Sequence, residues 1–156
     1  MTHALDGQAA PAFTLTDQHG RAFALEGQRG KAMLLVFVPF AFSDVCTNEL
    51  IDLRNAADLQ GRADLTVAIT ACDSIYTMKA WADTHSYRLP LLSDFWPHGE
   101  VARKYGVFNP QEGLATRGTF LIDANGVVRW SVVNPKGQAR DVDDYRREVH
   151  RLLGDA

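Results

Sequence analysis

Cys46 is the residue of this sequence best placed to do chemistry, because of two residues that precede it at fixed spacing. Pro39, Ser43 and Cys46 form the pattern Pro-x-x-x-Ser-x-x-Cys. Ser43 offers a hydroxyl that can bond sulfur or an incoming oxygen. Pro39 has no N–H, fixes the turn and can screen the thiol from one side. The pattern predicts a reactive thiol, whereas an isolated cysteine is more often a buried structural residue.

The segments on either side of this pattern indicate how the thiol is positioned. A dense apolar run over 31–38 predicts a buried strand, and apolar positions at helical spacing after Cys46 predict a helix to about Gln60. Cys46 then lies in the first helical turn. Free backbone N–H groups and the positive end of the helix dipole favour thiolate there, and the thiolate is the nucleophilic form of cysteine.

The rest of the chain predicts an α/β fold, with a central mixed sheet flanked by helices and an N-terminal β-hairpin. The expected elements are a hairpin over 13–25, a strand over 65–70, a helix capped by Ser74, a short strand over 89–94, a short helix starting at Pro97, a polar loop over 109–116, a hairpin over 118–133 and a helix capped by Asp141. No repeat or shift in composition divides the chain, so we expect one domain over residues 1–156.

Composition excludes several classes of function. A net charge of −3 gives no reason to expect nucleic acid or an acidic membrane surface as a partner. Two cysteines without a Cys-x-x-Cys pair are too few for a disulfide scaffold and argue against a dithiol oxidoreductase. The scattered histidines indicate no metal site, and no phosphate-binding or haem motif indicates a cofactor. The N-terminal residues lack the features of a signal peptide, so we expect a cytoplasmic protein.

The Pro39–Cys46 pattern resembles the peroxidatic signature of the peroxiredoxins, in which most members carry threonine where this chain has Ser43. The segments 73–81, 92–94, 102–107 and 117–123 resemble later landmarks of that family. The segment 91–109 and the lead-in over 39–42 are similar to the one-cysteine branch called AhpE. The resemblance implies a thioredoxin-like fold and a thiol-dependent peroxidase that reduces hydrogen peroxide, organic hydroperoxides or peroxynitrite through a cysteine sulfenic acid.

The resemblance also implies site residues and partners. Arg117 matches the arginine that packs beside the family's cysteine, where a guanidinium would favour thiolate and polarise the peroxide. Glu49, one turn after Cys46, could position Arg117 through an ion pair, or could be a solvated helix charge. The expected reductant is an external thiol: mycothiol, or a mycoredoxin- or thioredoxin-like protein. The family also suggests a homodimer.

Two alternatives stay open at this point. Cys72 follows a strand beside the one that leads to Cys46, so it could resolve the sulfenic acid in a two-cysteine peroxidase, although its position does not match the family's usual resolving cysteines. We expect it to be a structural thiol. The chain could also be a peroxide sensor or holdase, whose Cys46 oxidation changes partners without turnover. The serine, cysteine and arginine together favour the enzyme.

Overall fold

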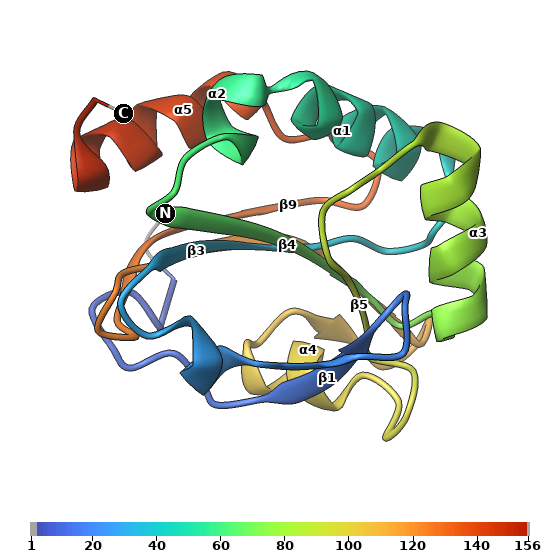
Figure 1. Cartoon of the computed structure of the whole chain (residues 1–156). Helices are drawn as coiled ribbons and strands as arrows, with labels where there is room; N and C mark the ends of the chain where they lie inside the picture. The colour runs from blue at the N-terminus through green and yellow to red at the C-terminus, as the bar shows by residue number, and fades with distance from the viewer. Residues whose placement is uncertain (1–2, 156) are drawn as a thin grey trace.

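A seven-stranded mixed sheet runs through the molecule in the order β2-β1-β5-β4-β3-β8-β9 (Figure 1). The computed structural model describes residues 3–155, so the outermost residues of the expected domain, 1–2 and 156, lie outside that range. The strands of this sheet are β1 Thr14–Asp17, β2 Ala22–Ala24, β3 Ala32–Phe37, β4 Leu65–Ala71, β5 Leu91–Ser93, β8 Arg117–Ile122 and β9 Val128–Asn134. Strands β6 (Phe108–Asn109) and β7 (Leu114–Ala115) form a separate pair.

Helices cover both faces of the sheet unequally. They are the 3-10 helix η1 Leu25–Gln28 and the α-helices α1 Asp44–Asn55, α2 Ala57–Gln60, α3 Ile75–His85, α4 Glu100–Lys104 and α5 Val142–Leu153. In Figure 1, α1, α2 and α5 lie along one face, and α4 lies on the other side. Helix α3 shares the core of α1 and α5. No helix within residues 3–155 is long and apolar enough to cross a bilayer.

Strand β3 separates two hydrophobic cores, which explains why it is apolar throughout. Its alternate residues Leu34 and Val36 belong to the core beneath α1, α3 and α5, whereas Leu35 and Phe37 belong to the core on the α4 side. All six residues of β3 are buried. A strand that packs on both faces reads as a continuous apolar run without polar alternation.

The pairing around β3 brings the predicted site residues to one edge of the sheet. Strand β4 runs parallel to β3, with Phe37 opposite Thr70. Strand β8 runs antiparallel to β3, with Val36 opposite Thr119. The C-terminal end of β3, which leads into α1, therefore lies beside the start of β8, where Arg117 stands. The mixed sheet and N-terminal hairpin agree with the predicted fold.

Two helices differ from the sequence expectation in where they begin or end. The helix after Cys46 does not continue to Gln60, because it breaks at Ala56, whose ψ is 70°. The Leu53 carbonyl accepts from the Ala56 N–H at 3.1 Å and from the Gln60 side chain at 3.0 Å, so the break leaves it paired. Helix α4 begins at Glu100 and not at Pro97, because the Asp94 carboxylate accepts the N–H groups of its second and third residues.

The predicted polar loop over 109–116 also contains strand structure. Strands β6 and β7 fold it back on itself, with Phe108 opposite Ala115. Leu114 and Ala115 are buried, and Ala115 belongs to the core on the α4 side. Two apolar residues were too short a run to indicate a strand.

Candidate active site

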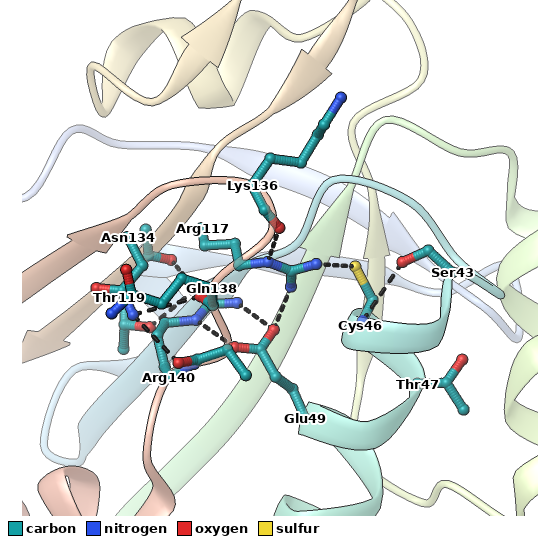
Figure 2. A network of polar contacts seen from close by, with 12 residues as sticks. Ser43, Cys46, Thr47, Glu49, Arg117, Thr119, Asn134, Lys136, Gln138 and Arg140 are labelled. Carbon is teal, nitrogen blue, oxygen red and sulfur yellow. Dashed lines mark hydrogen bonds and ion pairs between the residues drawn. The ribbon is translucent and has the colours of Figure 1, made fainter.

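The thiol of Cys46 lies in the first turn of α1 and is fully buried. Ser43 is the N-cap residue, and its Oγ accepts the Cys46 N–H at 3.4 Å. This bond satisfies one of the N–H groups that a helix start leaves free. The hydroxyl and the sulfur are thus held on the same short turn, as the spacing predicted. Figure 2 shows the bond from the Cys46 N–H to the Ser43 hydroxyl.

The guanidinium of Arg117 contacts the sulfur directly. Its Nη2 donates to Cys46 Sγ at 3.2 Å, its Nη1 pairs with Glu49, and its Nε donates to the Lys136 carbonyl. Figure 2 shows the guanidinium between the sulfur and the Glu49 carboxylate. Arg117 is only 2% exposed. A fixed cation at this distance favours thiolate over thiol, so the structure brings together the two residues that the resemblance paired.

Glu49 is the buried anion that pairs with the arginine side chains of this site. It is buried one turn after Cys46 and forms the expected ion pair with Arg117. Burial opposes its ionisation, but the hydrogen bonds and charge of Arg140, and then the charge of Arg117, outweigh burial. The pKa of Glu49 therefore lies below its ordinary value. Glu49 is not a solvated helix charge, and it stays ionised to orient Arg117.

Arg140 is a second buried arginine of this network that the sequence reasoning missed. Its Nε and Nη2 each donate to Glu49 at 2.9 Å, and its backbone N–H donates to the same carboxylate at 2.7 Å. Its Nη1 donates to the Gly118 carbonyl at 2.9 Å and to Thr119 Oγ1 at 3.1 Å. Although burial works against the charged form, the nearby Tyr145 and Glu49 raise the pKa of Arg140 above its ordinary value. No local pattern marks this residue, which stands just before the predicted cap Asp141.

A cavity of about 280 Å³ opens beside the thiol. Its walls include Pro39, Phe40, Ser43 and Arg117. Pro39 is buried and Phe40 is 46% exposed at the rim. The cavity therefore borders Ser43 and Arg117, the two residues that contact Cys46. With Glu49 paired to Arg117, the structure brings together all five predicted site residues.

Cys72 is buried on the other side of the sheet. Cys46 belongs to the core under α1, whereas the backbone of Ala115, which lowers the pKa of the Cys72 thiol against the effect of burial, belongs to the opposite core. Burial and then the charges of Asp94 and Asp73 raise the pKa of the Cys72 thiol to about 12. Both cysteines are free. The burial of Cys72 and the raised pKa of its thiol support a structural role for this residue.

No cluster of three or more His, Cys, Asp or Glu side chains that could hold a metal ion occurs among the described residues.

A buried thiol that a guanidinium contacts at a helix start, on a thioredoxin-like sheet, is the arrangement of a thiol peroxidase. The family model described as AhpC/TSA matches residues 7–131, and the chain belongs to this family. Alkyl hydroperoxide reductase E of Mycobacterium tuberculosis is 43% identical over 136 residues, which are 86% of this chain and 89% of that protein. This similarity confirms the predicted peroxiredoxin of AhpE type.

Other relatives agree with the assignment. Peroxiredoxin TSA1-B of Candida albicans is 35% identical over 150 residues, covering 90% of this chain and 76% of that protein. The structure of reduced Plasmodium vivax 2-Cys peroxiredoxin superposes with a TM-score of 0.86 at 28% identity, covering 96% of each chain. Enterococcus faecalis AhpC gives the same TM-score and identity over 99% of this chain and 98% of that one. The chain is a thiol-dependent peroxidase, and the sensor and two-cysteine alternatives are not favoured over it.

Proposed function

We propose that Cys46 is the peroxidatic nucleophile of this enzyme. The observation that carries the proposal is the 3.2 Å contact between Arg117 Nη2 and Cys46 Sγ in a fully buried setting. The thiolate attacks the terminal oxygen of a hydroperoxide, so that an S–O bond forms as the O–O bond breaks. The leaving group of an organic hydroperoxide is an alkoxide, which takes up a proton and leaves as the alcohol. Hydrogen peroxide releases hydroxide, which leaves as water, and peroxynitrite releases nitrite. The two-electron oxidation leaves Cys46 as a sulfenic acid.

The other predicted residues have distinct roles in this step. Arg117 stabilises the thiolate and the charge that develops on the peroxide oxygens, without itself losing a proton. Ser43 Oγ, on the same turn, donates to a peroxide oxygen in the cavity. Pro39 forms the wall beside it and carries no N–H that would compete for the sulfur. Glu49 is a positioning residue, because it holds Arg117 and does not touch the reacting atoms.

The charges of the buried network support a thiolate at Cys46. Arg117 and Arg140 carry two positive charges and Glu49 carries one negative charge, so the three together are left with one positive charge. Ionisation of Cys46 neutralises that excess. Because buried charge is unfavourable unless it is paired, this excess positive charge favours an anionic group beside it.

The cavity supports hydroperoxides as substrates, from hydrogen peroxide and peroxynitrite to those with an alkyl group. Phe40 at its rim and Val45 in its wall provide apolar surface for an alkyl chain. The reacting end of the substrate lies near Ser43 and Arg117. The name of the mycobacterial relative, an alkyl hydroperoxide reductase, agrees with this class of substrate.

We infer that the reductant is an external thiol, because Cys72 lies across the sheet from Cys46. A first thiol condenses with the sulfenic acid, which forms a mixed disulfide and releases water. A second thiol then displaces Cys46 and leaves with the first as a disulfide. Mycothiol, or a mycoredoxin- or thioredoxin-like protein, would supply these thiols. The cycle consumes reduced thiols, so we place the enzyme in the cytoplasm.

We also propose a homodimer that forms through the loops around the site. Four large apolar side chains, Phe40, Phe42, Phe95 and Trp96, are between 46% and 81% exposed. Phe40 and Phe42 belong to the loop that precedes Cys46. Exposed aromatic residues of this kind are enriched in protein–protein interfaces.

Repeated turnover tests the proposed function. Reduced enzyme is mixed with many equivalents of an alkyl hydroperoxide and an excess of dithiothreitol, and peroxide consumption is followed. We expect the wild type and Cys72→Ser to consume many equivalents, and Cys46→Ser to consume none above the background. Consumption that stops after one equivalent, with the thiol still present, would show a sensor instead of an enzyme.

A further inference from the structure

Asp73 lies outside the catalytic network but contacts the loop over residues 39–43 that leads to Cys46, which we call the Cys46 loop. Its Oδ2 accepts the backbone N–H of Ala41 at 2.9 Å, across 32 residues of sequence. Ala41 lies between Pro39 and Ser43, in the middle of the loop that carries the proposed nucleophile. Asp73 follows β4, the strand that pairs in parallel with β3.

The loop over 39–43 has few other polar attachments. Pro39 has no N–H, and within residues 3–155 no protein oxygen accepts the backbone N–H of Phe40, Phe42 or Ser43. Phe42 has a φ of 69°, in the left-handed region that a non-glycine residue rarely adopts. Such backbone persists only where the surroundings impose it. The contact with Asp73 is therefore one of the few that fix the shape of this loop.

Asp73 is itself anchored, so it can act as a fixed point. Its carbonyl accepts the Ser93 hydroxyl at 2.6 Å, which ties it to β5. Partial burial raises the pKa of its carboxyl group above the ordinary value, although the Ala41 N–H acts in the opposite direction. A neutral amide at this position would keep an oxygen for Ala41 and would avoid the desolvation of a charge.

The two halves of the catalytic cycle need different states of this loop. This step rests on the proposed function. The peroxide step needs the closed arrangement, in which Arg117 contacts the Cys46 sulfur. An external thiol is bulkier than the terminal O–O–H group of a hydroperoxide. It must also approach the Cys46 sulfur in line with the S–O bond of the sulfenic acid. Cys46 is fully buried when the loop is closed, so the reductant step needs the loop to open.

We propose that Asp73 is a positioning residue that holds the Cys46 loop closed through the Ala41 N–H. The contact favours the peroxide step and opposes the access of the reductant. Asp73 lies between β4 and α3 and touches neither substrate. Its contact with Ala41 nevertheless sets the balance between the rates of the two steps.

Three variants test this inference. Asp73→Ala removes the acceptor, Asp73→Asn keeps an oxygen for Ala41, and Asp83→Ala removes an exposed carboxylate of α3 as a matched control. Stopped-flow mixing measures the oxidation of Cys46 by hydrogen peroxide and, separately, the reduction of its sulfenic acid by dithiothreitol. For Asp73→Ala we expect oxidation to slow and reduction to speed up by factors whose product is about fivefold, because one hydrogen bond changes the ratio of closed to open loop by about that much. Asp73→Asn should return both rates to those of wild type.

Opposite shifts in the two rates support the inference, because simple damage to the fold would slow both. Any other pattern in Asp73→Ala, including two unchanged rates, overturns it. Hydrogen exchange over residues 41–47 of the reduced protein tests the contact without peroxide. It should be faster in Asp73→Ala and near wild type in the other two variants, and unchanged exchange would also overturn the inference. Failure of the proposed function is distinct, because the wild type itself would then not react with peroxide.

Discussion

Replacement of Arg140 by methionine probes the buried network most sharply. Methionine has an unbranched side chain that fills much of the space of the arginine stem, and it lacks the guanidinium. Four side-chain hydrogen bonds are lost: two to Glu49, one to the Gly118 carbonyl and one to Thr119. Glu49 keeps Arg117, and Thr119 keeps its bond with the Tyr145 hydroxyl at 2.9 Å.

The expected loss of stability follows from the burial of the pair. Removal of one partner from a buried ion pair costs ~3–5 kcal/mol, because the other partner stays buried with less compensation. The matched control is Arg129→Met, since Arg129 is 55% exposed and pairs with Asp123 at 3.3 Å. An exposed pair of this kind contributes ~0–1 kcal/mol. Urea unfolding, followed by tryptophan fluorescence, measures both variants against wild type.

The expected loss of activity follows from the charge of the network. Without Arg140, the charges of Arg117 and Glu49 cancel, and a thiolate at Cys46 becomes an unbalanced buried charge. An opposite charge in contact changes an ionisation equilibrium by about ten- to a thousandfold. Arg140 acts from beyond Glu49, so we expect the low end, a decrease of about tenfold in the rate of Cys46 oxidation. A loss of stability below ~1 kcal/mol, or an unchanged oxidation rate, would refute this account of the network.

Three further predictions concern single residues. Because the pKa of Glu49 lies below its ordinary value, its contribution to stability is present above pH ~4.3 and is lost as the pH falls through the lowered pKa. Acid unfolding of Glu49→Gln should therefore depend less on pH below ~4.3 than that of wild type. The pKa of about 12 for Cys72 predicts that iodoacetamide at pH ~8 labels this thiol only after unfolding, and labelling of Cys72 in the native state would contradict its burial. Ser43→Ala should slow Cys46 oxidation by about tenfold, with Ser43→Thr near wild type, because a hydroxyl bond to a charged group contributes ~1.5–3 kcal/mol. Equal rates for alanine and threonine would argue against the role of the hydroxyl.

Local signals were enough to predict where the Cys46 thiol lies in the fold. The apolar run before Pro39 and the helical spacing after Cys46 place the thiol at a helix start, whatever the rest of the chain does. Glu49 lies one turn along the same helix, so its position relative to the sulfur was also readable. The mixed sheet followed from the order of the strands, and the hairpins from their turns.

The rest of the site depends on contacts between distant segments, which no local pattern encodes. Arg117 was found through a family resemblance, since a lone arginine before a strand is otherwise a common loop residue. Arg140 reaches Glu49 across 91 residues, and Asp73 reaches Ala41 across 32. Neither stands in a segment of distinctive composition. The break at Ala56 was missed for a local reason: no glycine or proline marks it, and the Gln60 side chain donates to the Leu53 carbonyl that the break frees.

The location of the oxygen atom after a single oxidation tests the central claim most directly. Reduced protein receives one equivalent of hydroperoxide, and intact mass, peptide mapping and the free-thiol count follow for wild type, Cys46→Ser and Cys72→Ser. We predict rapid gain of one oxygen on Cys46 in the wild type and in Cys72→Ser, with no such gain in Cys46→Ser. Oxygen on Cys72, loss of both thiols without added oxygen, or a reaction no faster than that of free cysteine would contradict the account.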